Sequence, residues 1–117
     1  MIQQPSDAVS VREMSLYQQY YDLVAAGRKR VEVRVAYPAL LDLAPGQRIR
    51  FRCGQQSTLT QVTRVTRYAN FEELLDNEGV EAVNPTASRD DQLRAIRDIY
   101  PPAKEELGCL AIAIEKI

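Results

Sequence analysis

Residues 27–34 of this chain read Gly27-Arg28-Lys29-Arg30-Val31-Glu32-Val33-Arg34. From residue 30 onward charged and apolar residues alternate strictly, which predicts a strand with one buried face and one polar face. Glu32 and Arg34 lie two positions apart, so they would share the polar face. Lys29 joins this pair only if the chain is still turning at Gly27. The stretch therefore predicts a rigid cluster of charges at the start of a strand.

An amphipathic helix is predicted immediately before this strand. Ser15 would cap it, with Gln18 completing a capping box, and Gly27 would end it in the left-handed conformation. Its apolar stripe would include Tyr20, which we therefore expect in the core. A short strand is expected before the helix, at residues 8–12.

More strands are predicted at 47–53, 58–68 and 109–115, where β-branched and apolar residues gather. Val62 and Val65 have opposite parity within the second of these, which predicts a β-bulge between them. Asn70 and Ser88 are each expected to cap a helix, the second with a core side of Leu93, Ile96 and Tyr100. Residues 79–87 are expected to be irregular.

These elements predict an α+β, mainly β fold: a small, partly open β-barrel of five to six strands with flanking helices. The connections between the early strands are too short for helical crossovers, which argues against a parallel α/β sheet. Residues 1–10 are expected to form a flexible N-terminal tail, and residues 11–117 a single domain.

Histidine is absent from the 117 residues, and this excludes several kinds of chemistry. Ser-His and Cys-His nucleophile pairs, histidine bases and histidine-ligated metals are all ruled out. The two cysteines form no Cys-x-x-Cys pair, so we expect two buried, reduced thiols and no metal or other cofactor. No signal peptide or membrane span is predicted, and a cytoplasmic location is expected.

Charge is distributed unevenly along the chain. Residues 1–68 hold ten Lys/Arg against five Asp/Glu, whereas residues 69–117 hold five against eleven. Three arginines on one face of a predicted strand, Arg48, Arg50 and Arg52, are candidate phosphate contacts, and a solvated strand face is the alternative. The acidic segment 72–98 is a solvated helical face or a surface for a protein partner.

The pattern Gly27-x-Lys29-x-x-Glu32-x-Arg34 resembles the signature of the ASCH domain, a branch of the PUA-like barrel superfamily. Later segments fit the same family pattern over roughly residues 11–116: Pro45-Gly46 before Ile49-x-Phe51, Tyr68-x-x-Phe71-x-x-Leu74, and Ile99-Tyr100 before Gly108-Cys109-Leu110-Ala111-Ile112. The sequence departs from the pattern at Gln47, where relatives carry an acidic residue, and at Arg12-Glu13-Met14, where many have His-x-Met.

The resemblance implies a role in binding RNA or a nucleotide-like ligand. One branch of the family contains an amidohydrolase that acts on N4-acetylcytidine and uses a threonine as nucleophile beside the signature lysine. Glu32 occupies the threonine position here, so this activity does not transfer as it stands.

The predicted site is therefore a polar cleft in which Lys29, Glu32 and Arg34 bind the ligand. Tyr21 and Tyr68 are expected to supply stacking surface. The sequence favours a binding module over an enzyme. A metal-independent hydrolase remains the alternative, with Glu32 as general base and Lys29 stabilising an oxyanion. A salt-bridge network that only closes the barrel end is the purely structural interpretation.

Overall fold

The computed structural model describes residues 11–117, so the predicted N-terminal tail and the start of the first predicted strand lie outside the described residues. The elements follow in the order β1 (Val11–Ser15), α1 (Gln18–Ala25), β2 (Val31–Val35), η2 (Pro38–Leu40), β3 (Arg48–Cys53), β4 (Gln56–Tyr68), α2 (Phe71–Glu78), α3 (Val80–Val83), α4 (Arg89–Ile99), α5 (Pro102–Glu105) and β5 (Cys109–Lys116). Within residues 11–117, no helix has the length and apolarity needed to cross a bilayer.

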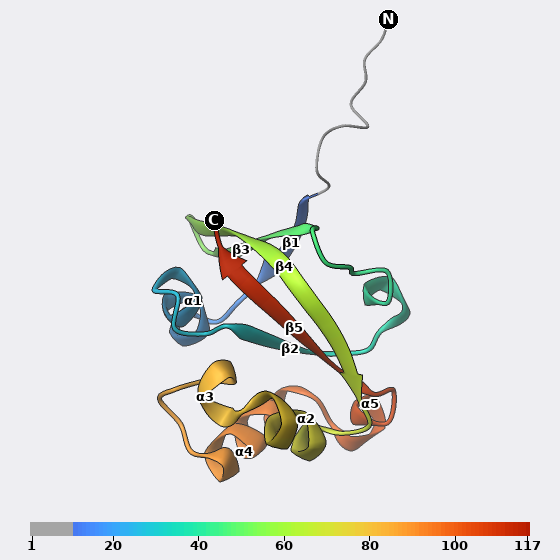
Figure 1. Ribbon diagram of the computed structural model, residues 1–117. Coiled ribbons are helices and arrows are strands. Elements are labelled where there is room, and N and C mark those ends of the chain that lie inside the picture. Colours follow the sequence, from blue (N-terminus) through green and yellow to red (C-terminus); the bar gives the residue numbers. More distant parts are fainter. Residues whose placement is uncertain (1–10) are drawn as a thin grey trace, which may run out of the picture.

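The five strands form one curled sheet in the order β1-β3-β4-β5-β2 (Figure 1). β1 pairs in parallel with β3, and the other three pairings are antiparallel. The two edge strands, β1 and β2, come within reach of one side chain. Nη2 of Arg34 in β2 donates to the carbonyl oxygen of Ser15, the last residue of β1, at 3.0 Å. The sheet is therefore a partly open barrel, and one hydrogen bond from Arg34 links its two edges.

A β-bulge in β4 confirms the parity argument made from the sequence. The register with β5 moves from Val62 opposite Ile114 to Arg64 opposite Ala113, which leaves Thr63 without a partner residue. The extra residue turns both Val62 and Val65 toward the same apolar cluster.

Two apolar clusters cover the two faces of the sheet. On one face the valines of β2 pack against α2, α3 and α4, with Phe71, Leu74 and Leu93 among the contacts. Figure 1 shows these three helices gathered together on one side of the strands. On the other face Ile49 and Phe51 pack with residues of β1, β4 and β5, and both are fully buried. β2 thus lies in the wall between the barrel interior and the helical layer.

Helix α1 ends in the turn that places the charged cluster. The amide of Gly27 donates to the carbonyl of Val24 at 3.0 Å, and that of Arg28 to Leu23 at 2.8 Å, which together form a Schellman motif. Gly27 has φ +73°, a conformation that costs other residues energy. The start of the helix differs from the prediction, because Ser15 belongs to β1, where it pairs with Arg52. Helix α1 begins at Gln18 without a side-chain cap.

The other caps follow the prediction. Oδ1 of Asn70 accepts from the amide of Glu73 at 2.8 Å, and Oγ of Ser88 from the amide of Asp91 at 3.2 Å. The segment 79–87 contains α3, a short helix that sequence reasoning missed. The cysteine prediction is half right, since Cys109 is fully buried whereas Cys53 is only partly buried. Burial raises the pKa of the Cys109 thiol to about 12.

Candidate functional site

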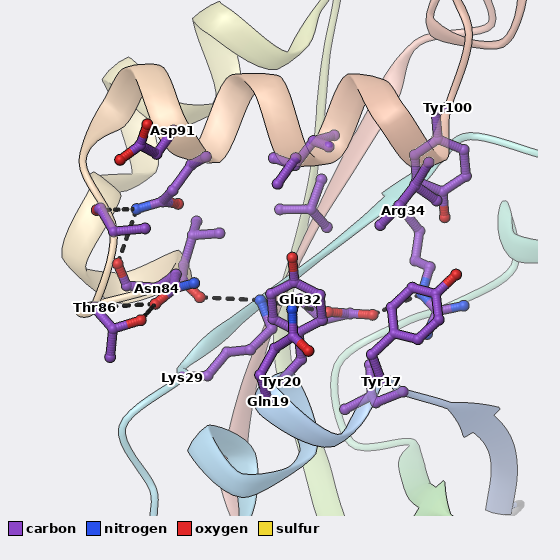
Figure 2. A pocket seen from close by; sticks show the side chains of 18 of the residues that line it. Tyr17, Gln19, Tyr20, Lys29, Glu32, Arg34, Asn84, Thr86, Asp91 and Tyr100 are labelled. Atoms are coloured by element: carbon purple, nitrogen blue, oxygen red, sulfur yellow. Dashed lines mark hydrogen bonds and ion pairs between the residues drawn. The ribbon is translucent and has the colours of Figure 1, made fainter.

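A cleft of about 710 Å³ opens between α1 and α4, directly over edge strand β2. Figure 2 shows its arrangement: Lys29, Glu32 and Arg34 lie along the floor, Tyr17, Gln19 and Tyr20 belong to the α1 side, and Asp91 and Tyr100 to the α4 side. This volume lies within the range of small-molecule binding sites. The charged stretch singled out from the sequence therefore forms the floor of the cleft.

Glu32 is the centre of the floor. One carboxylate oxygen accepts from Arg34 Nε at 2.7 Å, and the other lies 3.5 Å from Lys29 Nζ. The glutamate is 5% exposed, so both partners act on it through a medium with little water. The predicted same-face pairing of Glu32 and Arg34 is confirmed, and the turn at Gly27 brings Lys29 to them as the sequence required.

Lys29 holds the floor to the helical layer. Its ammonium donates to the carbonyl oxygens of Val31 at 2.9 Å and of Val83, the last residue of α3, at 3.0 Å. Two of its three N–H donors are thus bonded to carbonyls, and its charge faces Glu32 Oε1 at 3.5 Å. Burial lowers the pKa of Lys29, and the charge of Glu32 opposes that effect. Lys29 thus fixes the position of Glu32 and of α3.

Arg34 is the most accessible of the three charges, with 22% of its side chain exposed. Burial disfavours its charge, but the hydrogen bond and charge of Glu32 outweigh this and raise the pKa of Arg34. Nε and Nη2 are bonded to Glu32 and Ser15, and no residue among 11–117 accepts a hydrogen bond from Nη1. Arg34 therefore offers a free donor on a permanent, pre-positioned cation.

The rim of the cleft is aromatic and apolar. Tyr17, the residue before α1, is 65% exposed, and Ile99 near the end of α4 is 42% exposed. The rings of Tyr17 and Tyr20 lie 6.4 Å apart in a tilted arrangement. Tyr100 stacks on Phe71, and burial raises the pKa of its hydroxyl. A flat ligand that enters the cleft would contact these aromatic and apolar side chains.

The two tyrosines predicted to line the cleft lie elsewhere. Tyr21 is 5% exposed and its hydroxyl bonds Thr58 Oγ1 at 2.8 Å, whereas the hydroxyl of Tyr68 donates to Glu78 Oε2 at 2.6 Å. Tyr20 and Tyr100 both line the cleft, and Tyr100 also packs against the core cluster, as expected for it. Adjacent residues of α1 point about 100° apart, and only the position of the sheet decides which of them is buried.

The arginines of β3 are not part of the cleft lining. Arg52 forms an ion pair of 2.6 Å with Glu13 of β1, and Arg50 lies 3.8 Å from the same carboxylate. Arg48 is half-buried, and its Nε has no hydrogen-bond partner within residues 11–117. A phosphate at this surface would have to compete with Glu13.

Sequence reasoning missed the contribution of the segment between α3 and α4. Asn84 and Thr86 line the cleft from this segment, and Gln92 from α4. Gln92 carried one detectable signal: it lies four residues before Ile96 on the stripe that faces inward, where a polar residue is unusual.

Comparison with known proteins identifies the fold. The family model described as the ASCH domain matches residues 14–117. The crystal structure of hypothetical protein PH0355 is 31% identical, covers 92% of this chain and 100% of that chain, and superposes with a TM-score of 0.85. The solution structure of protein PF0455 from Pyrococcus furiosus is 29% identical over 92% of this chain and 98% of that one, with a TM-score of 0.75.

A more distant structure, ASCH from Zymomonas mobilis, is 17% identical over 90% of this chain and 66% of that chain, with a TM-score of 0.65, and shows the fold alone. No curated protein matches the chain. The predicted ASCH resemblance and the partly open, PUA-like barrel are confirmed by these comparisons and by the curled five-stranded sheet.

Proposed function

The chain belongs to the ASCH domain family, and from that premise we propose that it is an RNA- or nucleotide-binding module whose ligand enters the cleft over β2. The observation that carries the proposal is the combination of a charged floor with an aromatic rim in one cleft. Lys29 and Arg34 outnumber Glu32, which leaves the floor with an excess positive charge. A nucleotide has the matching parts, since its base stacks on aromatic rings and its phosphate attracts cations.

The three floor residues have different roles in this proposal. Arg34 contacts the ligand through its free Nη1, because it is the most exposed of the three. Glu32 holds Arg34 in place and offers its carboxylate edge to a ligand donor. Lys29 acts mainly by fixing Glu32, since its donors already have partners.

The same contacts favour recognition over hydrolysis. A general base needs a carboxylate free to take a proton from water, and both oxygens of Glu32 face a cation. An oxyanion stabiliser needs free donors, whereas two of the three donors of Lys29 are bonded to carbonyls and its charge already faces Glu32. The hydrolase alternative, acting on N4-acetylcytidine or RNA, therefore requires the ion pairs to rearrange when substrate binds.

Two surfaces outside the cleft, the acidic segment 72–98 and the arginines of β3, are further candidates for contacts with a partner or a longer ligand. Within residues 72–98, Glu72, Asp76 and Glu78 form ion pairs with Arg97, Arg89 and Arg64, so a protein partner would compete with these arginines. Arg48, Arg50 and Arg52 would contact phosphates only in a ligand long enough to leave the cleft.

The arginine surface of β3 can be tested by salt dependence. If Arg50 and Arg52 contact phosphates, the double substitution Arg50→Gln/Arg52→Gln should reduce the slope of log affinity for a short single-stranded RNA against log salt by about 1.4. The substitution Arg89→Gln/Arg94→Gln is the matched control, because it also removes two arginines that are paired with acids on the surface. Equal slopes in both variants and in the wild type would show that the β3 arginines touch no phosphate.

The cleft itself is tested at Tyr17. Since stacking on an aromatic ring contributes about 1–3 kcal/mol per base, Tyr17→Ala should weaken binding of nucleosides or short RNA about tenfold or more. The stability of the Tyr17→Ala variant should barely differ from that of the wild type, because Tyr17 is 65% exposed. Titration calorimetry over a panel of nucleosides, nucleotides and oligonucleotides measures the effect, and mass spectrometry of the recovered ligand detects any hydrolysis.

Leu41→Ala is the control for this experiment. Leu41 is a large apolar residue that is 50% exposed and does not line the cleft. Its substitution should leave the affinity unchanged. If no member of the panel binds the wild type, or if Tyr17→Ala and Leu41→Ala behave alike, the cleft is not the binding site we propose.

A further inference from the structure

Gln92 is a buried amide on the α4 side of the cleft. It lies in the second turn of α4, is 4% exposed, and lines the cleft together with Asn84 and Ala87. Its buried position next to Leu93 is unusual for glutamine, which is mostly exposed in folded proteins. Such a residue requires hydrogen bonds to offset the cost of burying its amide.

Only one end of this amide has partners. Nε2 lies 2.9 Å from the carbonyl oxygen of Val80, 2.8 Å from that of Asn84 and 3.0 Å from that of Ala87. Oε1 is buried and accepts no hydrogen bond from any residue among 11–117. The amide is thus fully used as a donor and unused as an acceptor.

The orientation of the amide is fixed. Rotating it by 180° would place Oε1 against three carbonyl oxygens, all of which can only accept. Since Nε2 and Oε1 diverge from one carbon, Oε1 is turned away from the segment that holds Nε2. The fold therefore holds Oε1 of Gln92 beside the cleft in one orientation. Burying this acceptor without a donor costs free energy of folding.

We propose that Gln92 is a specificity-determining residue, whose Oε1 accepts a hydrogen bond from an N–H group on the base of the bound nucleoside or nucleotide. This inference rests on the proposed function and deepens it. The edge of a nucleobase carries N–H donors beside acceptors. Arg34 Nη1 supplies a free donor and Gln92 a free acceptor, so the same cleft holds both complements of such an edge.

The test compares ligands in which the N–H groups of the base edge are replaced by N-methyl groups. Three pairs are titrated by calorimetry: cytidine and N4,N4-dimethylcytidine, adenosine and N6,N6-dimethyladenosine, uridine and N3-methyluridine. The wild type should prefer the unmethylated member of at least one pair about tenfold or more, because a buried acceptor left without a donor costs about that much in affinity. The pair that shows the preference identifies the base edge that is read.

The variant Gln92→Lys removes the acceptor and keeps the donors. An ammonium group has three N–H donors and no acceptor, which matches the three carbonyls around Nε2. In this variant the ratio of the affinities for the unmethylated and methylated members should fall to about 1. Gln55→Lys, at an exposed position that does not line the cleft, makes the same chemical change and should keep the wild-type preference.

Each outcome decides the proposal. Loss of the preference in Gln92→Lys but not in Gln55→Lys supports it, and an unchanged preference in Gln92→Lys overturns it. If circular dichroism shows that Gln92→Lys does not fold, Gln92→Met serves in its place. Equal binding of both members of all pairs by the wild type also overturns the role of Gln92. If the wild type binds none of the nucleosides and no oligonucleotide, the proposed function itself fails.

Discussion

Glu32→Gln is expected to lower the free energy of unfolding at pH 7 by about 3 kcal/mol, because it leaves a buried cation without its charged partner. Glu32 faces Lys29 at 3.5 Å and Arg34 at 2.7 Å, and both it and Lys29 are almost completely buried. Glutamine keeps the shape of glutamate but replaces one acceptor oxygen with an NH2 donor, so the loss measures the charge and one acceptor rather than packing. Urea unfolding followed by circular dichroism gives the free energy.

The loss should depend on pH in one direction. Burial lowers the pKa of Lys29 and Glu32 raises it, so Glu32→Gln lowers it further. Between this lowered pKa and the ordinary value of 10.5, the unfolded chain binds more protons than the folded one, and stability rises with pH. The deficit of Glu32→Gln should therefore shrink as the pH is raised from 7 toward 10, whereas the part that is due to Arg34 should remain.

Glu13→Gln is the matched control for this experiment. Glu13 also faces two arginines, at 2.6 Å and 3.8 Å, but half of its side chain is exposed. Exposed ion pairs contribute little to stability because water screens them, so this substitution should leave the unfolding curve nearly unchanged at every pH. Equal losses in the two variants would mean that burial does not strengthen the Glu32 network.

Local rules predicted the parts of this fold that depend on neighbours in the sequence. Alternation alone predicted that Glu32 and Arg34 are neighbours, and parity predicted the bulge between Val62 and Val65. The glycine after α1 predicted the turn that brings in Lys29. Each of these depends on backbone geometry over fewer than eight residues, which tertiary packing left unchanged.

The parts that failed depend on distant segments. Ser15 has the right type and spacing for a cap, but pairing with β3 draws it into β1. Periodicity marks one side of α1 as apolar without telling whether a given tyrosine meets the sheet or the cleft. The α4 wall approaches β2 across more than fifty residues, so no local pattern could join Gln92 to the signature. The sequence therefore predicted the floor of the cleft but not its walls.

The charged residues of the signature have two kinds of role: Lys29 and Glu32 hold other groups in place, and Arg34 can contact a ligand. The buried pair of Lys29 and Glu32 costs desolvation and gains little net stability, which suggests that it is kept for the precise placement of a third group. That group is Arg34, which reaches the cleft, the carboxylate and the edge of β1 with one guanidinium. A planar fork can hold two fixed partners and still present a free N–H in a fixed direction, whereas the N–H groups of an ammonium rotate on a flexible chain.

Arg34→Gln is therefore expected to weaken nucleotide or RNA binding on the order of a hundredfold. A charge-assisted hydrogen bond is worth about 1.5–3 kcal/mol, and every 1.4 kcal/mol is about tenfold in affinity. The substitution also removes the closest cation from Glu32, whose carboxylate would then repel a phosphate. Arg34→Lys should keep the charge but lose the fork, and its loss of affinity should be intermediate.

Arg12→Gln is the control, since Arg12 pairs with Asp42 at 2.9 Å and does not line the cleft. Both substitutions remove one positive charge, so long-range attraction changes equally in the two variants. Affinities are measured by calorimetry at one salt concentration, after circular dichroism has shown that each variant is folded. A loss of affinity in Arg34→Gln but not in Arg12→Gln identifies a direct contact between Arg34 and the ligand. Equal losses in the two variants would mean that Arg34 acts only through its net charge, and would contradict the cleft as the site of recognition.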